Sequence, residues 1–279
     1  MRTVSLVIPA YNEEENIAPT LAAIPVAALR NAGYDVEVLV VDNASTDRTG
    51  EVARAHGARV IVQPVRGYGN AYKAGFANCT GDVIATGDAD LTYPWHVVPE
   101  VISRLRADDL DFITTDRLAD LDRASMTRSH VFGNHMLSLV TRTLFAVPFR
   151  DSQSGMWIFR RQLLHALRPR SGGMAFSQEL KIEAHRRGFR CLEVPIDYFP
   201  RGGATKNRTI RDGIGNLSHL VAARLGGRRD SASGLVAAPP MKALPAGTAS
   251  SIAALPADAA SPIAALPPGP TSPSVSTAA

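Results

Sequence analysis

Cysteine is scarce in this chain, because Cys79 and Cys191 are the only two among 279 residues. Two thiols are too few for a disulfide-stapled scaffold, so the composition favours a reducing compartment. Long apolar runs are also missing, since no stretch approaches the ~20 apolar residues that a membrane-spanning helix needs. The N-terminus shows no secretory pattern either. We therefore expect a soluble, cytoplasmic protein that contacts a membrane at most peripherally, on its cytoplasmic face.

The motifs of several common chemistries are missing as well. The chain has no Gly-x-Ser-x-Gly nucleophile elbow and no Walker phosphate loop, and its seven histidines lack zinc-type spacing with cysteine. Gly67-Tyr68-Gly69 follows the third predicted strand and has Tyr72 where a dinucleotide fingerprint needs glycine, which argues against NAD(P) binding. The basic residues accompany neither an aromatic stacking platform nor a nucleic-acid motif, so we expect no nucleic-acid partner.

Residues 231–279 differ in composition from the rest of the chain. Fifteen of these 49 residues are alanine and nine are proline, none is aromatic, and Lys242 and Asp258 carry the only charges. Such a segment buries little apolar surface, and its prolines interrupt helices and strands. We therefore predict one domain over residues 1–230 and a disordered Ala/Pro-rich tail over residues 231–279. A docking arm for a partner is the alternative reading of the tail.

Charge is segregated along the predicted domain. Residues 1–150 contain 14 Lys and Arg against 18 Asp and Glu, whereas residues 151–230 contain 15 against 7. The net charge is therefore −4 in the first segment and +8 in the second. A basic second segment suits a phosphate-bearing partner or an anionic membrane surface, although solvated helix faces are a plainer explanation.

Apolar runs alternate with amphipathic segments along the predicted domain. The runs expected to form strands are Val4–Ile8, Val36–Val41, Arg59–Val62, 82–86, Asp111–Thr115, Gly155–Phe159, Cys191–Pro195 and Ile196–Phe199. Asn12 is expected to cap the first helix, and two more helices are expected after the loops Asn43–Asp47 and Arg66–Asn70. Later helices are expected over 126–146, Ser177–Arg187 and Ile210–Leu225. This alternation predicts an α/β fold with a mainly parallel sheet and helices on both faces.

Two carboxylates follow the predicted strand at 82–86, with one residue between them. Side chains two positions apart on an extended backbone point the same way, so Asp88 and Asp90 can share one divalent cation. Mg²⁺ and Mn²⁺ suit a site with few carboxylates and substrate phosphate oxygens. A simple polar turn is the plainer interpretation. Because Tyr11–Glu13 and Asp42-Asn43 also follow parallel strands, all three turns should share one sheet edge and form one site.

Four motifs in order resemble those of the family 2 glycosyltransferases, which have the GT-A fold. They are Leu6–Glu14, Val40–Asp47, Gly67–Ala71 with Gly75, and Gly87–Asp90. The resemblance implies an enzyme that uses a nucleotide-sugar donor, such as a UDP- or GDP-sugar. It also implies a nucleotide-binding half over about residues 1–115 and an acceptor-side half over about residues 116–230.

The second half is similar to the polyprenyl-phosphate glycosyltransferases, the dolichyl-phosphate mannose synthase group. The segments that carry this likeness are Asp151–Met156, Phe176–Leu180, Glu193–Ile196 and Arg201–Lys206. The chain departs from the group at Leu91–Pro94, where Gln-His-Pro is usual, at Met156-Trp157 for Phe-Arg, and at Thr205 for Ser. These departures leave the sugar and the acceptor open, whereas the carboxylate pair is retained.

The resemblance assigns roles to particular residues. The expected donor-binding residues are Pro9, Tyr11, Asn12, Glu13, Asp42, Gly69, Asp88, Ala89 and Asp90, of which Asp88 and Asp90 would hold Mg²⁺ or Mn²⁺. The expected acceptor-phosphate ligands are Arg117, Arg128, Arg201 and Lys206. Asp90 is expected to be catalytic through the cation. If the acceptor is a hydroxyl, Glu179 or Asp151 would serve as the general base.

Three functions remain open at this point. The first is inverting transfer of a hexose or N-acetylhexosamine to a polyprenyl phosphate by a peripheral membrane enzyme. The second is a soluble family 2 glycosyltransferase that acts on a hydroxyl of a small metabolite or glycan. The third is a non-catalytic protein that binds a sugar nucleotide. A helix over Ile210–Leu225, apolar on one side and flanked by arginines, could lie in a membrane interface or pack on the domain.

Overall fold

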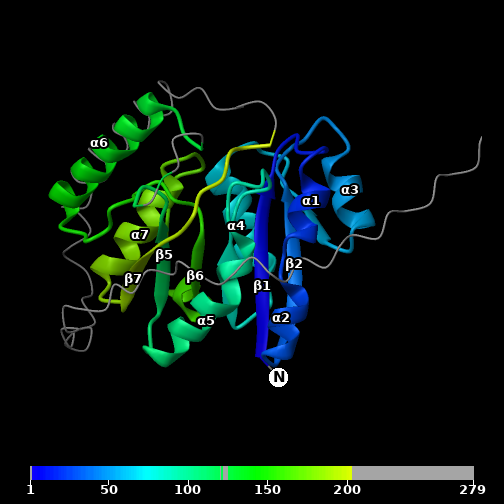
Figure 1. Cartoon of the computed structure of the whole chain (residues 1–279), viewed down its shortest axis with the longest axis horizontal. Helices are drawn as coiled ribbons and strands as arrows, with labels where there is room; N and C mark the ends of the chain where they lie inside the picture. The colour runs from blue at the N-terminus through cyan, green and yellow to red at the C-terminus, as the bar shows by residue number, and fades with distance from the viewer. Residues whose placement is uncertain (1, 120, 122–124, 203–279) are drawn as a thin grey trace, which may run out of the picture. The chain divides into compact units, whose positions relative to one another are not determined.

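The computed structural model describes residues 2–119, 121 and 125–202. In this part of the chain seven strands form one sheet, in the order β3-β2-β1-β4-β6-β5-β7 (Figure 1). The strands are β1 (Arg2–Ala10), β2 (Tyr34–Asp42), β3 (Arg59–Val62), β4 (Val83–Thr86), β5 (Phe112–Asp116), β6 (Trp157–Arg160) and β7 (Cys191–Pro195).

The sheet is mixed but mainly parallel. β1 pairs in parallel with β2 and β4, β2 with β3, and β5 with β7. β6 runs antiparallel to both of its neighbours, β4 and β5. The predicted mainly parallel sheet is therefore confirmed. The sequence does not indicate the reversal of β6, because a short apolar run has the same pattern in either chain direction.

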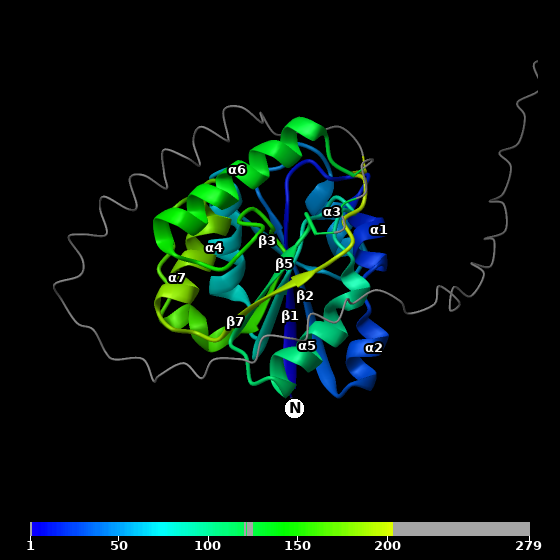
Figure 2. The ribbon, with the colours of Figure 1, turned by 60° about the vertical axis from the view of Figure 1, so that its left-hand side comes forward.

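Helices cover both faces of the sheet, as predicted. Figure 2 shows α4 and α7 on one side of the sheet and α2 and α5 on the other. The helices are α1 (Ile17–Ala22), α2 (Val26–Asn31), α3 (Thr49–Ala55), α4 (Tyr68–Asn78), α5 (Val98–Ala107), α6 (Arg128–Phe145) and α7 (Phe176–Arg186), with 3-10 turns η1 (Trp95–Val97) and η2 (Arg161–His165).

Local predictions fail where loop chemistry overrides the apolar pattern. The first predicted helix divides into α1 and α2, because Pro25 cannot donate the backbone hydrogen bond that a continuous helix needs. Asn12 does not cap it: Asn16 precedes α1, while Asn12 has a left-handed φ of 53°. The predicted strand at Ile196–Phe199 is irregular, and the helix α5 was not predicted from the sequence.

The larger core lies between the sheet and the helices α4 and α7. Tyr72 of α4 stacks on Phe176 of α7 with 5.9 Å between ring centroids, and its ring lies 4.9 Å from Trp157 of β6. All three side chains are fully buried. In β1, every residue from Val4 to Ala10 is buried, as expected for a central strand covered on both faces.

The polar turns predicted to share one edge do so. Ala10 at the end of β1 pairs with Asp42 at the end of β2, and Val7 pairs with Thr86 at the end of β4. The chain leaves all three parallel strands at the same edge of the sheet, which is where open α/β sheets bind ligands. This edge positions the candidate site.

Several predictions lie outside the described residues. These are Lys206, the helix at Ile210–Leu225, the domain boundary near residue 230 and the tail over residues 231–279. Within the described residues, none of the helices combines the length and apolar character required to cross a bilayer.

Candidate active site

The loop after β4 holds the two predicted metal-binding carboxylates. It begins at Gly87, where an added Cβ would lie 2.7 Å from the Trp95 ring, so a side chain there would displace the loop. Asp90 is buried, and its Oδ1 accepts a hydrogen bond of 2.6 Å from the Thr92 hydroxyl. Leu91, which lies between Asp90 and Thr92, has a φ of 68°. This left-handed conformation is uncommon for a branched residue and typical of functional turns.

Asp88 lies in an electrostatically unfavourable position. The residue is partly exposed, but its Oδ1 atom is buried and finds no hydrogen-bond partner among the described residues. Burial and the neighbouring charge of Asp90 raise the pKa of Asp88 to about 7, although Arg117 and Arg201 partly offset this. A divalent cation beside Asp88 Oδ1 would satisfy this oxygen, so the residues fit such an ion.

A single arginine links the loops after β1 and β4. Arg201 Nη2 lies 2.5 Å from Glu13 Oε1, and Arg201 Nη1 lies 3.3 Å from Asp90 Oδ2. The Gly202 amide donates to the Asp90 carbonyl at 3.1 Å, and its carbonyl accepts from Asn16 Nδ2 at 2.9 Å. The segment 201–202 therefore closes the edge at which Glu13 and Asp90 meet.

The turns after β1 and β2 are bound to each other. Asn12 Oδ1 accepts from the Thr46 amide at 2.8 Å, and the Asn12 amide donates to Ser45 Oγ at 3.1 Å. Within the second turn, Asp42 Oδ1 accepts from the Ser45 amide at 3.0 Å. The Arg66 guanidinium lies 3.8 Å from the centre of the Tyr11 ring, which is a cation–π contact. Two further predicted donor residues are also buried, namely Pro9 in β1 and Ala89 in the loop after β4.

The glycines before α4 allow a close approach between two protein loops. A Cβ on Gly69 would lie 2.3 Å from the Ser171 carbonyl oxygen, and one on Gly67 would lie 2.3 Å from the Gly172 carbonyl oxygen. The Asn70 amide donates to the same Gly172 carbonyl at 3.1 Å. The close approach of the Ser171 carbonyl is therefore enough to explain why position 69 is glycine. Contact between Gly69 and a donor stays a prediction.

Arg117 and Asp151 form a buried, bidentate ion pair on the acceptor side. Arg117 Nε lies 2.7 Å from Asp151 Oδ2, and Nη2 lies 3.0 Å from Oδ1. The Arg117 guanidinium also lies 5.2 Å from the centre of the Tyr198 ring. Burial alone would raise the pKa of Asp151, but Arg117 and Lys181 together lower it to about 2. Such a weak base is poorly suited to take a proton from a hydroxyl.

The remaining predicted residues occupy different surroundings. Glu179 lies in the first turn of α7, and its Oε2 accepts from the Ser171 amide at 2.7 Å. Arg128 is exposed at the start of α6, and no hydrogen bond or ion pair within the described residues joins it to the other predicted site residues. Arg201 therefore forms an ion pair with Asp90, and the charge of Arg117 acts on Asp88, whereas neither kind of interaction with the carboxylate pair is seen for Arg128 within the described residues.

Sequence reasoning missed several residues that shape this site. The Tyr93 hydroxyl accepts from the Gly155 amide at 2.7 Å, and Lys181 Nζ donates to the Asp151 carbonyl at 2.6 Å. Burial lowers the pKa of Lys181 to about 8, while Asp151 and Glu193 oppose this shift. The only sequence signal for Lys181 was a charge between the apolar residues Leu180 and Ile182 of a predicted helix.

The fold and the carboxylate pair after β4 define a protein of the GT-A class. A family model described as glycosyl transferase family 2 matches residues 5–168. The chain belongs to glycosyl transferase family 2, and the sequence-based resemblance is confirmed.

Two curated relatives are similar to more than two thirds of the chain. The chain is 36% identical over 203 residues to a dolichyl-phosphate hexose transferase of Haloferax volcanii, covering 73% of this chain and 86% of that protein. It is also 36% identical over 221 residues to the low-salt glycan biosynthesis hexosyltransferase Agl6 of the same organism, covering 78% of this chain. The chain spans about half the length of Agl6, since the match covers 53% of it.

Solved structures give the same fold. Glucosyl-3-phosphoglycerate synthase from Mycobacterium tuberculosis, in complex with Mn²⁺, UDP and phosphoglyceric acid, is 27% identical with a TM-score of 0.60. The alignment covers 82% of this chain and 79% of that one. A complex of the same enzyme with Mg²⁺ and UDP is 26% identical with a TM-score of 0.60.

Proposed function

We propose that the protein is an inverting, metal-dependent glycosyltransferase that moves a hexose or N-acetylhexosamine from a nucleotide sugar to a polyprenyl phosphate. The observation that carries the metal requirement is the buried Asp88 Oδ1 atom, which is unpartnered within the described residues and lies two positions before buried Asp90. The similarity to a dolichyl-phosphate hexose transferase supports the acceptor class.

The donor end of the site is made of carboxylates and backbone turns. Asp88 and Asp90 would hold Mg²⁺ or Mn²⁺, and the ion would neutralise negative charge that develops on the leaving nucleotide diphosphate. Within the described residues, no three His, Cys, Asp or Glu side chains gather as a metal site, so donor phosphates would complete the coordination. Glu13 and Asp42 accept hydrogen bonds from the ribose hydroxyls of the donor.

The acceptor end is cationic. An ionised lipid phosphate needs positioning rather than a strong general base, and arginine binds phosphate through paired hydrogen bonds. Asp151 holds Arg117 through Nε and Nη2, which leaves Nη1 without a hydrogen-bond partner among the described residues. Asp151 therefore acts by positioning Arg117. Arg201 and Lys206, of which Lys206 lies outside the described residues, complete the set of phosphate-binding residues. Exposed Arg128 contacts the acceptor only while the acceptor enters the site, and does not bind its phosphate.

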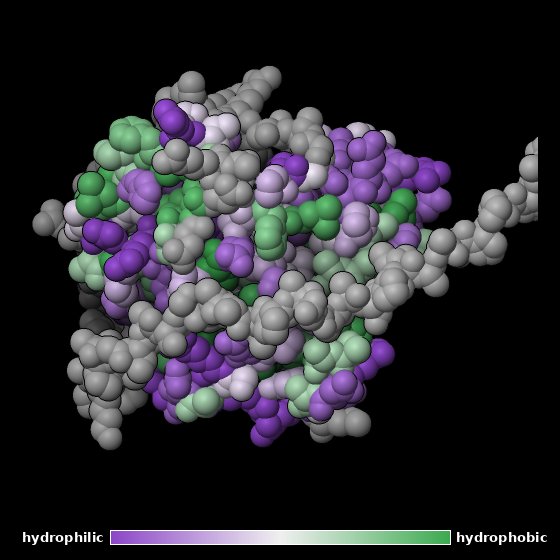
Figure 3. Space-filling model, in the orientation of Figure 1, coloured by the Kyte–Doolittle hydropathy of each residue, from purple (hydrophilic) through white to green (hydrophobic). Residues whose placement is uncertain are grey.

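Contact with a membrane is supported by the surface of α6. Phe132, Met136 and Leu139 have exposed fractions of 69%, 44% and 46%, and their spacing places them on one side of the helix. Figure 3 shows hydrophobic side chains gathered over the part of the surface where α6 lies. The buried side of α6 reaches the acceptor end, because Ser138 Oγ accepts from the Ser152 amide at 2.9 Å.

A second candidate function is transfer to the hydroxyl of a small soluble molecule. It is favoured by the structural similarity to glucosyl-3-phosphoglycerate synthase, which was crystallised with phosphoglyceric acid. Transfer to a hydroxyl would need a general base. Glu179 is then the candidate, because the ion pair with Arg117 disqualifies Asp151.

The experiment that tests both functions is a transfer assay with the purified full chain. Radiolabelled nucleotide sugars are incubated with Mg²⁺ or Mn²⁺ and short polyprenyl phosphates, and label in the organic phase is counted. We expect transfer that stops with chelator and falls at least about a hundredfold in Asp90→Ala, because electrostatic stabilisation of the leaving group is lost. Asp35→Ala, which removes an exposed carboxylate near the start of β2, should retain transfer.

Other outcomes would redirect the assignment. Nucleotide release only with water-soluble acceptors would favour the second function, and Glu179→Gln should then abolish release. Tight nucleotide binding with no turnover on any donor would indicate a non-catalytic binding protein. Undiminished transfer after chelation would contradict the metal requirement.

A further inference from the structure

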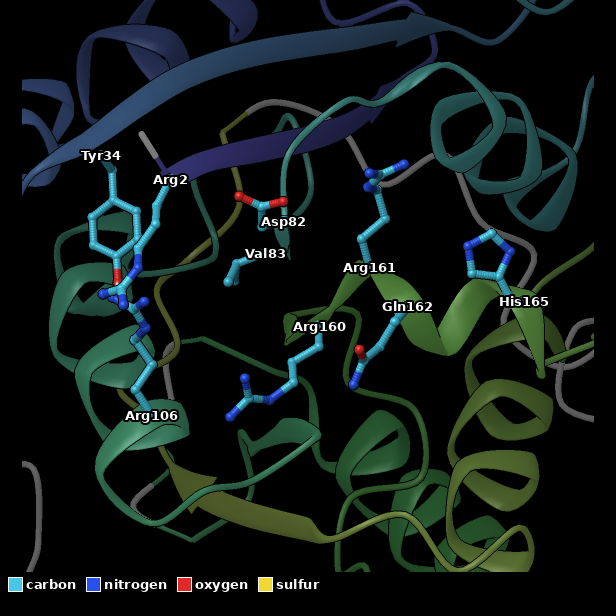
Figure 4. A pocket seen from close by; sticks show the side chains of 9 residues that line it. All are labelled: Arg2, Tyr34, Asp82, Val83, Arg106, Arg160, Arg161, Gln162 and His165. Atoms are coloured by element: carbon cyan, nitrogen blue, oxygen red, sulfur yellow. The ribbon is translucent and has the colours of Figure 1, made fainter.

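A pocket lies at the end of the sheet opposite to Asp88 and Asp90. Its cavity has a volume of about 330 Å³. It is walled by the first residues of β1, β2 and β4, by the last turn of α5 and by the junction of β6 with η2 (Figure 4). Asp88 and Asp90 follow the other end of β4, so the pocket is separate from the candidate active site.

The lining of this pocket is strongly basic. Arg2, Arg106, Arg160 and Arg161 line it, and Asp82 is its only acidic residue. These four arginines and one aspartate give the lining three net positive charges. The Asp82 carboxylate is partly engaged, because its Oδ2 accepts from the Thr3 amide at 3.3 Å.

Within the described residues, three of the four pocket arginines form no ion pair with a carboxylate. The Arg161 Nε atom is buried and has no hydrogen-bond partner within the described residues. In the same part of the chain, Arg2 and Arg106 form no ion pair with a carboxylate; Arg106 instead donates to the Tyr34 hydroxyl at 2.6 Å. Arg160 pairs only with Asp109, at 3.2 Å, and that carboxylate is largely exposed.

We propose that this pocket binds a small phosphate-bearing anion, of the diphosphate or sugar-phosphate class, from solution. Guanidinium groups match phosphate oxygens through paired, charge-assisted hydrogen bonds, and four arginines line this one cavity. The cavity volume is at the lower end of the range for small-molecule sites, which suits a compact anion. The proposal does not depend on the glycosyltransferase function.

The position of the pocket indicates whether its ligand is a free anion or the phosphate of a lipid head group. Figures 1 and 2 both show α6 at the top of the molecule and the start of β1, which lines the pocket, at the bottom. A membrane that contacts the exposed apolar side of α6 would therefore lie away from the pocket. This favours a soluble anion.

The test is calorimetric titration of the full chain with inorganic pyrophosphate, in chelator and low salt. We expect one saturable site whose affinity falls about tenfold or more in Arg161→Ala and in Arg106→Ala, because each removes a charge-assisted contact. Arg104→Ala, on the same helix but paired with Asp108 outside the pocket, is the matched control and should bind normally. Thermal melting shows whether each variant is folded, and exposed Arg2→Ala replaces any that is not.

Each remaining outcome counts against the proposal. It is overturned if pyrophosphate shows no saturable binding, or if the pocket variants bind as well as the wild type. Loss of binding in Arg201→Ala would overturn it too, because the probe would then occupy the candidate active site. Flotation with phosphatidylglycerol vesicles tests the lipid source: vesicle binding that depends on Arg161, without pyrophosphate binding, would refute a soluble ligand.

Discussion

At the scale of single residues, Arg117 and Asp151 show how burial fixes the chemistry of a side chain. Asp151 is fully buried and accepts two hydrogen bonds from the Arg117 guanidinium. Its oxygens also accept from the amides of Gln153 and Ser154, both at 3.0 Å. The carboxylate is therefore held ionised, and it fixes the position of the Arg117 guanidinium.

This pair predicts a pH dependence of stability. The pKa of Asp151 is about 2, below the ordinary 3.8, so the ionised form stabilises the fold above about pH 4, and this stabilisation is lost as the pH falls toward 2. The difference corresponds to about 2 kcal/mol, roughly half of it lost by pH 3. Urea unfolding of the wild type and of the double variant Arg117→Met with Asp151→Asn should show the variant losing less stability between pH 5 and 3.

The double variant removes both partners, so neither charge stays buried alone. Asp108→Asn, which removes an exposed carboxylate at the end of α5, should keep the wild-type pH dependence. If the double variant also follows the wild-type curve, the low pKa of Asp151 is refuted.

The site residues that could be predicted from the sequence are those that lie close together along the chain. Asp88 and Asp90 follow a short apolar strand, so their meeting at a sheet edge could be predicted without coordinates. The partner of Asp151 could not, because Arg117 is 34 residues away and only folding brings the two charges together. Lys181 was hidden for the same reason.

At the scale of elements, α6 combines two different surfaces. Its buried side carries Ser138, Thr141 and Phe145, whereas Phe132 and Met136 project outward. Exposed large apolar side chains on one helix side are unusual in a protein that stays in water, and they suit a helix that lies in the interfacial region of a bilayer.

Replacing this surface should weaken membrane binding. In a flotation assay with anionic vesicles, Phe132→Ser with Leu139→Ser should reduce the bound fraction several-fold, because about 2 kcal/mol of burial is lost for each large side chain. Val65→Ser, at an apolar residue that is 63% exposed but lies outside α6, is the matched control. Equal vesicle binding by all three proteins would contradict a membrane role for α6.

Most elements could be predicted from apolar periodicity, and the failures have physical causes. The range Arg59–Val62 was predicted as β3 with its observed bounds. The break at Pro25 and the irregular 196–199 segment depend on local backbone chemistry that periodicity does not register. The direction of β6 depends on which strands it joins, which is a property of the whole sheet.

At the scale of the whole molecule, the predicted division at residue 230 leads to a further expectation. A chain that ends at residue 230 keeps all the predicted site residues, including Lys206. We expect it to retain the melting temperature of the full chain within about 2 °C, because the Ala/Pro-rich tail contributes little apolar burial. Its transfer activity should also be unchanged. Calorimetric melting and the transfer assay check this, and a clear loss in either would indicate a docking role for the tail.

The ion pair between Arg201 and Glu13 joins residues 188 positions apart in the chain. A ribosome that adds about 5–20 residues per second would therefore finish Glu13 roughly 10–40 seconds before it supplies Arg201. Throughout that interval the nascent polypeptide has its acidic edge without the guanidinium that later screens it. Assembly of this edge is thus a late event in biosynthesis, and a translational stall before codon 201 would yield a β-sheet that lacks this closing contact.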